Sequence, residues 1–437
     1  MEVETMKTKK LLVVQVAALG YDFLATNADP VCDDLAFEPM DTIFPALTCP
    51  VQASFRTALP PGAHGMTANG IWDERYARVR FWEQASGLVE GDRIWKNWRQ
   101  AGGTTALLFW QQILGESVDM VLSPAPIHKH HGGMIQDCYG QPPDLYNRLC
   151  HNLGRPFQLA RYWGPLASPA SSQWIAEATC RVLAGGADAP GLCLTYLPAL
   201  DYDLQRYGTR DPRSLKALNA AMAQLTLLRQ AARANGYEMV VFGDYAIGDC
   251  AAGAVLPNRL LREAGLFEVR EVRGRAYPDF YRSRAVALVD HEVAHVHVRD
   301  SADIERTVAA LKGHPGIGRI LQGEALAAIG LAHPRAGQLV LEATAGYWFA
   351  YPWWEKPREA PNYAGHVDIH NKPGYDPCEL FWGWPPGTVG QNPSRIRGSH
   401  GRIGSTRRAA WASTCLERKP TTLLDLANEV RKWLGKE

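Results

Sequence analysis

Short, continuous apolar runs alternate along this chain with longer amphipathic segments. The runs at 10–19, 191–197 and 238–243 predict buried strands, because they are unbroken and contain many β-branched residues. Between the last two, leucine and methionine recur at helical spacing and predict a helix over 213–236. Strands joined through helices predict an α/β fold of three layers (αβα), with a mainly parallel sheet covered by helices on both faces.

The pattern changes after residue 250. Apolar runs at 285–290 and 294–298 predict two further strands. Segments with helical spacing flank them at 256–266 and 304–312. These elements predict an α+β lobe, either inserted into the main domain or placed at the edge of its sheet.

The last part of the chain combines loops with one helix. Tryptophan, tyrosine and proline crowd residues 346–400, and a long irregular segment of this kind is typical of loops that cover a site. Apolar residues at helical spacing predict a closing helix over 421–434. We therefore expect a core α/β domain over 1–250, the added lobe over 251–345, and loops that return to the core over 346–437.

The first twenty residues allow two interpretations. Lys7, Lys9 and Lys10 precede an apolar run that ends at Leu19, as in a secretory leader. Gln15 interrupts the run, no small-residue cleavage site follows it, and its β-branched residues favour a buried strand. No stretch approaches the ~20 apolar residues of a membrane-spanning helix, so no membrane partner is expected.

Charge and cysteine content narrow the class of function. In 437 residues, 46 Lys and Arg balance 45 Asp and Glu, for a net charge of +1. This balance is unlike that of a protein that binds a nucleic-acid polymer, so a small-molecule substrate is expected. The nine cysteines are scattered and include no CxxC pair, which favours a reducing, cytoplasmic location. The oligomeric state is not indicated.

The most informative segment begins Phe44-Pro-Ala-Leu-Thr48-Cys-Pro50. Thr48 precedes a predicted helix, where free backbone N–H groups favour an anion. A hydroxyl in that place is a candidate nucleophile toward phosphorus if its proton can be removed. On spacing alone, however, the favoured role for Thr48 is the N-cap of the helix.

This segment resembles the nucleophile segment of the alkaline phosphatase superfamily, in its nucleotide pyrophosphatase/phosphodiesterase branch. That branch has a Phe-Pro-x-x-Thr-x-Pro run, followed by a His-Gly segment and an Asn, here His64-Gly65 and Asn69. The resemblance continues in order at 197–208, 241–245 and 397–401. It therefore spans nearly the whole chain and implies a metal-dependent phosphoryl-transfer hydrolase acting on a small phosphorylated substrate.

By this resemblance Thr48 would be the nucleophile and would form a covalent phospho-enzyme. Asp201 and His400 would bind one metal ion, and Asp244 would bind a second. Two such ions can polarise the phosphoryl oxygens and stabilise the leaving oxygen. The resemblance implies zinc, as one or two ions, although manganese and iron also suit His and Asp ligands.

Four positions depart from the pattern of the family. Ala17 stands where a metal-binding Asp is expected, and Gln205 and Tyr245 stand where metal-binding histidines are expected. Val51 replaces an Asn that contacts the transferring group. Three remaining ligands are too few for two zinc ions. The site is therefore rebuilt, holds one metal ion, or has lost catalysis.

Other residues could complete a rebuilt site. Asp368 and His370 share a face if their segment is extended, and are the first candidates for replacement metal ligands. Asp290 and His291 are weaker candidates, because they lie beside a predicted strand pair and not in the aromatic segment that leads to His400. For both pairs the alternative is an Asp and a His that make ordinary hydrogen bonds. The expected substrate contacts are Asn69, Gln205, Tyr245 and Arg56.

Three functions follow from this pattern. The first is a phosphodiesterase or pyrophosphatase-like hydrolase that acts through a phospho-threonine at position 48. The second is a degenerate member of the family that binds a phosphorylated ligand without turnover. The third is a phosphotransferase that passes the phosphoryl group to another hydroxyl.

Overall fold

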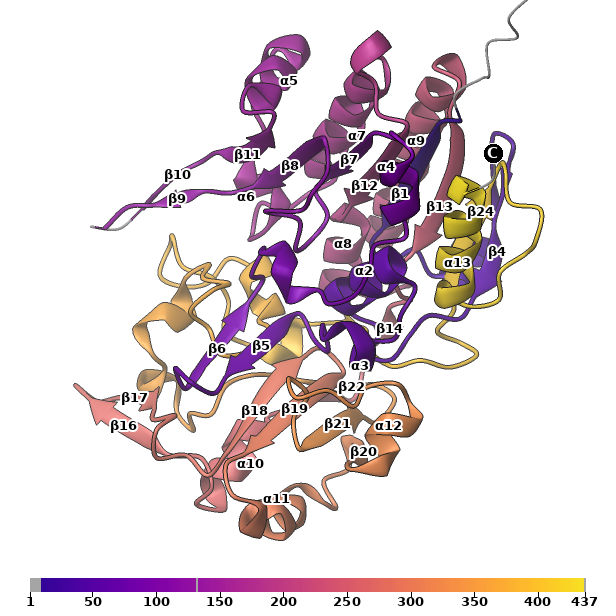
Figure 1. Cartoon of the computed structure of the whole chain (residues 1–437). Coiled ribbons are helices and arrows are strands. Elements are labelled where there is room, and N and C mark those ends of the chain that lie inside the picture. Colours follow the sequence, from indigo (N-terminus) through magenta and orange to yellow (C-terminus); the bar gives the residue numbers. More distant parts are fainter. Residues whose placement is uncertain (1–8, 131–132, 436–437) are drawn as a thin grey trace, which may run out of the picture.

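A central sheet of eight strands organises the computed structural model, which describes residues 9–130 and 133–435 (Figure 1). Lys7, part of the leader-like pattern, lies outside the described residues. From one edge to the other the strands are β11 (Cys138–Gln141), β8 (Met120–Pro124), β7 (Thr105–Leu108), β12 (Leu192–Leu197), β1 (Leu11–Val16), β13 (Glu238–Gly243), β24 (Ala409–Ser413) and β4 (Glu38–Met40).

The middle of this sheet is parallel and its edges are antiparallel. Strands β8, β7, β12, β1 and β13 pair in parallel, whereas β11, β24 and β4 pair antiparallel with their neighbours. Every residue of β1 and β12 is buried, as expected for strands covered on both faces. The mainly parallel three-layer prediction is confirmed, and the three strands predicted in the first 250 residues are β1, β12 and β13.

Two groups of helices cover the sheet, one on each face (Figure 1). In one group, α9 (Pro212–Ala234) packs against α7 (Ala170–Leu183) and α8 (Ala199–Tyr207). In the other, α13 (Leu423–Gly435) packs against α2 (Thr48–Thr57) and α4 (Lys96–Gln100). The predicted helices at 213–236 and 421–434 are α9 and α13. Among the helices that the structure describes, none is long and apolar enough to cross a membrane.

A second, four-stranded sheet lies beyond one end of the first (Figure 1). Its strands, all antiparallel, are β18 (Ala285–Asp290), β19 (Val293–Val298), β21 (Leu339–Ala343) and β20 (Ile317–Leu321). Helices α10 (Pro257–Glu263) and α11 (Ile304–Leu311) accompany it, and it has an apolar core of its own. These elements fall within 251–345, where the sequence predicts an α+β lobe.

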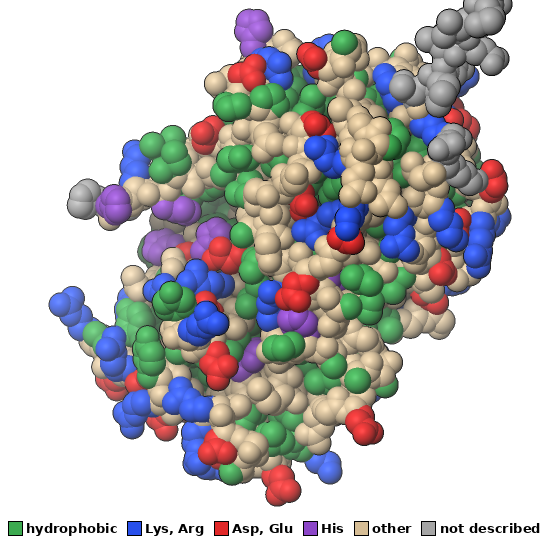
Figure 2. All heavy atoms as spheres, viewed as in Figure 1, with side chains coloured by type: hydrophobic (Ala, Val, Ile, Leu, Met, Phe, Trp, Pro, Cys, Tyr) green, Lys and Arg blue, Asp and Glu red, His purple; other side chains and the backbone are tan. Residues whose placement is uncertain are grey.

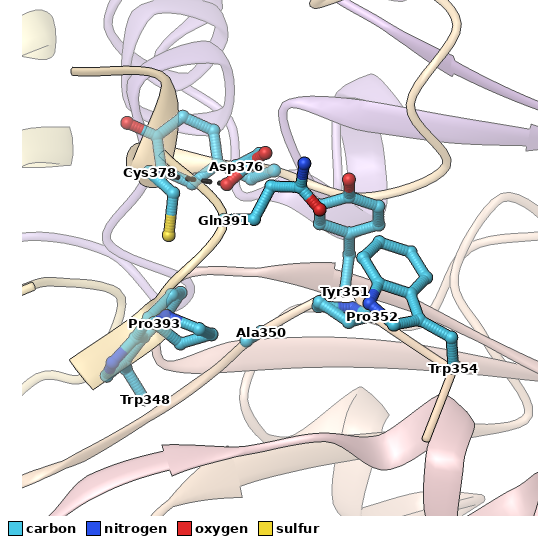
Figure 3. A pocket seen from close by; sticks show the side chains of 10 residues that line it. Trp348, Ala350, Tyr351, Pro352, Trp354, Asp376, Cys378, Gln391 and Pro393 are labelled. Atoms are coloured by element: carbon cyan, nitrogen blue, oxygen red, sulfur yellow. Dashed lines mark hydrogen bonds between the residues drawn. The ribbon is translucent and has the colours of Figure 1, made fainter. Parts of the chain in front are cut away.

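The aromatic loops after residue 345 pack inward. Trp348 and Trp353 are buried, and the residues around them leave a cavity of about 10 Å³, no larger than one water molecule (Figure 3). In Figure 3, Tyr351, Trp354 and Pro393 line this space, and Asp376 accepts a hydrogen bond from the Cys378 backbone. This part of the aromatic segment therefore belongs to the hydrophobic core, and its cavity is too small to hold an aromatic ring of a ligand.

A buried ion-pair cluster fixes the loop that precedes Leu380. Lys372 Nζ lies 2.8 Å from Asp376 Oδ2 and 2.7 Å from Glu379 Oε1, and the lysine side chain is 1% exposed. Removing one partner of a buried pair leaves uncompensated charge. We expect Lys372→Met to lower the free energy of unfolding by about 3–5 kcal/mol, measured by urea denaturation.

The matched control is Lys96→Met. Lys96 also pairs with an aspartate, Asp92, at 2.8 Å, but its side chain is 49% exposed. The control should change the free energy of unfolding by no more than about 0.5 kcal/mol. Equal effects of the two substitutions would contradict a stabilising role for the Lys372 cluster.

Candidate active site

The carboxyl ends of three neighbouring strands meet at one edge of the main sheet. Val16, the last residue of β1, is in register with Leu197 of β12 and Gly243 of β13. The residues that follow these strands therefore emerge together, at the edge where α/β proteins commonly bind ligands. Asp201 and Asp244 are brought to this edge in this way.

Thr48 is the first residue of α2, and its hydroxyl does not cap the helix. The N-cap residue is Leu47, and no side chain caps this end. The Thr48 Oγ1 atom instead lies 3.4 Å from the Tyr245 hydroxyl, and the side chain lines a large cavity. The Thr48 hydroxyl therefore does not act as the N-cap. It faces the cavity at a helix N-terminus, a position that favours anions and suits the alternative role of nucleophile.

Asp201 and His400 face each other with unpartnered atoms. Asp201 Oδ1 lies 3.9 Å from His400 Nε2, and neither atom has a hydrogen-bond partner. The other Asp201 oxygen accepts a hydrogen bond from the Gln205 amide, and His400 Nδ1 donates to the Ala46 carbonyl at 2.8 Å. Burial lowers the pKa of His400 well below its usual value, so the ring is neutral and Nε2 is an acceptor.

His291 joins this group from the other lobe. It lies in the turn between β18 and β19 with a φ of +62°, a conformation that costs energy for a residue with a bulky side chain. Its ring centroid is 3.8 Å from that of His400. His291 Nδ1 lies 2.8 Å from Asp290 Oδ1, and Asn69 holds Asp290 through its backbone N–H at 2.7 Å. These bonds orient the ring, while His291 Nε2 is buried without a partner.

Asp244, in contrast, has a full set of partners. Oδ1 accepts hydrogen bonds from the backbone N–H groups of Ala18 at 2.8 Å and Tyr245 at 3.0 Å. Oδ2 accepts from Gln15 Nε2 at 3.0 Å. The carboxyl group is completely buried, and burial raises its pKa well above the usual value. Each of the two Asp244 oxygens therefore already accepts a hydrogen bond from the protein.

Tyr245 fills the space beside His400. The two rings stack with centroids 3.4 Å apart and planes within 4°. The Tyr245 hydroxyl contacts Thr48. Burial raises the pKa of Asp201 to about 7, and the neighbouring side chains of Gln205 and Tyr245 oppose that rise. An aromatic ring thus occupies the side of the site where a second metal ligand is expected.

These contacts test which metal centre the residues could hold. Two ions do not fit, because Asp244 is satisfied by protein donors and Ala17 offers no donor atom. One cation fits the chemistry of the remaining set: Asp201 Oδ1, His291 Nε2 and His400 Nε2 are all buried acceptors without a donor. Within residues 9–130 and 133–435, no three His, Cys, Asp or Glu side chains already stand in the arrangement of a metal site.

Several predicted site residues lie elsewhere. Asp368 and His370 line the outer part of the large cavity, where Asp368 binds Asn371 and His370 Nδ1 contacts the Phe81 carbonyl. Arg56 is completely buried and donates to the Gln112 carbonyl at 2.8 Å, away from the cavity. Asn69 positions Asp290 and accepts from the backbone N–H of Cys49 at 2.9 Å.

Two site residues were missed in the sequence. Tyr375 stacks on His291 with centroids 3.7 Å apart and donates to Gln205 Oε1 at 2.9 Å. No local pattern marks it. Gln15 could have been found, because a polar side chain inside a fully buried strand must have a buried partner, here Asp244.

Comparison with known proteins identifies the family. A profile of type I phosphodiesterases/nucleotide pyrophosphatases matches residues 33–376. The chain belongs to this family. The match confirms the relationship that the motifs indicated, and it places this chain in a family whose members typically depend on divalent metal ions.

Solved structures share the fold of this family member at low sequence identity. Phosphonoacetate hydrolase from Sinorhizobium meliloti 1021, in complex with phosphonoacetate, is 15% identical with a TM-score of 0.66. Murine ectonucleotide pyrophosphatase/phosphodiesterase 5 is 13% identical with a TM-score of 0.62. Each alignment covers 98% of this chain and 96% of the other. No curated protein sequence matches the chain. Family and fold together support phosphoryl-transfer hydrolysis as the general kind of function.

Proposed function

We propose that this chain hydrolyses a small phosphodiester, pyrophosphate or phosphonate-type substrate through a covalent phospho-threonine at Thr48. One observation carries the proposal: the uncapped Thr48 hydroxyl lies at the first turn of α2, in the cavity that Asp201 and His291 also line. The N-terminal end of this helix favours the negative charge of a phosphoryl group. Helix α2 would thus provide both the nucleophile, Thr48, and the positive end of the helix that favours the phosphoryl group.

The residues suggest the following steps. Thr48 Oγ1 attacks phosphorus and gives up its proton through the Tyr245 hydroxyl, 3.4 Å away, while the bond from phosphorus to the leaving oxygen breaks and that oxygen takes up a proton. Water then attacks the phospho-threonine, so that the product leaves and the Thr48 hydroxyl is restored. A divalent cation held by Asp201, His291 and His400 would supply positive charge beside the phosphoryl oxygens, and zinc, manganese or iron suits these donors.

One observation favours a second candidate function. Tyr245 stacks on His400 and both Asp244 oxygens accept hydrogen bonds from the protein, which disfavours the second metal ion that the family resemblance implies. A site altered in this way would also suit a protein that binds a phosphorylated ligand without turnover. The two candidates differ in whether phosphorus becomes bonded to Thr48.

Trapping the intermediate tests the proposal. We expect acid quenching during turnover of bis(p-nitrophenyl) phosphate to leave p-nitrophenyl phosphate esterified to the peptide containing Thr48, detected by mass spectrometry. Divalent zinc, manganese and iron are each added in separate assays. Turnover with an unmodified Thr48 peptide would contradict the covalent route, and no turnover with any metal would favour the binding protein. An intermediate discharged only by an added alcohol would instead indicate a phosphotransferase.

The location of the protein is a further proposal. All nine cysteines are unpaired in the structure, and several are buried. Unpaired thiols in this number are typical of a reducing compartment. They support a cytoplasmic location.

A further inference from the structure

A cavity of about 640 Å³ opens above the candidate nucleophile. Thr48, Asp201, Tyr245 and His291 lie in its wall, so it is continuous with the reacting centre. In Figure 2 a hollow enters the left side of the molecule between the two lobes, with purple His side chains around it. Its volume falls within the roughly 300–1,000 Å³ typical of pockets that enclose a drug-sized ligand. A phosphoryl group alone would leave most of this space empty.

The wall of this cavity is mainly apolar and aromatic. Trp82, Phe109, Tyr162, Trp163, Leu166 and Val367 all contribute to it. Leu166 is 43% exposed and Val367 is 44% exposed, although both are large apolar side chains. Exposed apolar surface gathered in a cavity marks a site for an apolar ligand group.

Fixed positive charge is missing from the same wall. Among the described residues that line the cavity there is no Lys or Arg. The basic side chains that line it are His128, His291, His366 and His370. Of these, His128, His366 and His370 are exposed and lie away from the buried reacting centre. A chain of two or three phosphates would bring several negative charges against this wall without the cations that normally pair with them.

We propose that the natural substrate carries a single phosphoryl or phosphonyl group joined to a large apolar group, which fills this cavity. The inference rests on the proposed function, since it names the substrate class of the same site. The apolar group would contact the aromatic wall while the phosphoryl group lies at Thr48. Nucleoside di- and triphosphates should be poorer substrates, because the described cavity wall beyond the reacting centre has no Lys or Arg to pair with additional phosphates.

The test uses p-nitrophenyl esters of methyl, butyl and octyl phosphate with the full-length protein. Thr48 would displace p-nitrophenolate from each, so only the size of the remaining apolar group changes. We expect kcat/KM to rise at least about a hundredfold from the methyl to the octyl ester, because each buried CH2 is worth up to about fourfold. The p-nitrophenyl ester of thymidine 5'-phosphate should be hydrolysed less efficiently than the octyl ester. Equal rates for all chain lengths, or preference for the thymidine ester, would overturn the inference.

A pair of variants locates the effect in the cavity. Leu166→Asp places a charge in the wall and should reduce the octyl-to-methyl ratio of kcat/KM by at least about tenfold. Val272→Asp is the matched control: Val272 is 38% exposed, lies in β16 (Val269–Val272), and is not part of the cavity wall. The control should leave the ratio unchanged. Equal effects of the two substitutions would place the preference elsewhere.

A binding experiment tests the substrate class independently of whether Thr48 is the nucleophile. Octylphosphonic acid and AMP are titrated calorimetrically into the Thr48→Ala variant, which needs no turnover. Tighter binding of octylphosphonic acid by at least about tenfold supports the substrate class even if no ester is hydrolysed. Tighter binding of AMP overturns it, even if Thr48 proves to be the nucleophile.

Discussion

Replacing Thr48 with alanine is expected to lower kcat for bis(p-nitrophenyl) phosphate by at least about a thousandfold. The reason is that the substitution removes the only atom proposed to bond to phosphorus, while the surrounding groups remain. Steady-state kinetics over a range of substrate concentrations measures the effect. KM should change much less than kcat, because the cavity that binds the substrate is intact.

Thr48→Ser is the matched control for this result. Serine keeps the hydroxyl at the start of α2 and removes one methyl group, so at least about a tenth of the wild-type kcat should remain. Both variants should unfold at a similar temperature. Equal activity of the alanine and serine variants would show that Thr48 is not the nucleophile.

The second large effect separates two carboxylates that the family resemblance treats alike. We expect Asp201→Asn to reduce kcat/KM by at least about a hundredfold, because the unpartnered Oδ1 is the acceptor that faces His400 and the site. The same variant should bind zinc or manganese more weakly by at least about tenfold in calorimetric titration. Both expected effects follow from the one unpartnered oxygen of Asp201.

Asp244→Asn should change kcat/KM by less than about threefold. Its Oδ1 would continue to accept from the Ala18 and Tyr245 N–H groups. The new Nδ2 atom would face Gln15, whose own Oε1 has no partner, so a flip of the Gln15 amide provides an acceptor. A large loss of metal affinity in this variant would contradict the assignment of one cation and restore the two-metal site.

The fold could be predicted because its signals are local. The continuous apolar runs of β1, β12 and β13 and the helical spacing of α9 follow from burial on both faces of a parallel sheet. Motif order then placed Thr48, Asp201 and His400 near one edge of that sheet. The antiparallel strand β24, which lies between β13 and the edge strand β4, has no such signal, because its sequence is short and rich in alanine.

The site could be predicted only in part, because its other members depend on contacts between lobes. His291 reaches the site through a turn of the second sheet, and Tyr375 reaches it from a loop. Asp368 and His370 share a spacing that suits a metal, yet their segment is not a strand and leads them to the outer cavity. Spacing along the chain cannot specify how a loop is folded onto a distant surface.

The stacked ring of Tyr245 affects which substitutions could create a second metal site in this chain. A pair of ions of the kind that the family resemblance implies would require Asp at 17, His at 205 and His at 245 together. Asp at 17 alone would bury an additional anion next to Asp244, at a position now completely enclosed. His at 245 alone would remove a ring in close contact with His400 and leave space with only one new donor. Each of these single substitutions is expected to be unfavourable by itself. A second metal site is therefore not expected to arise in this chain by one substitution at a time.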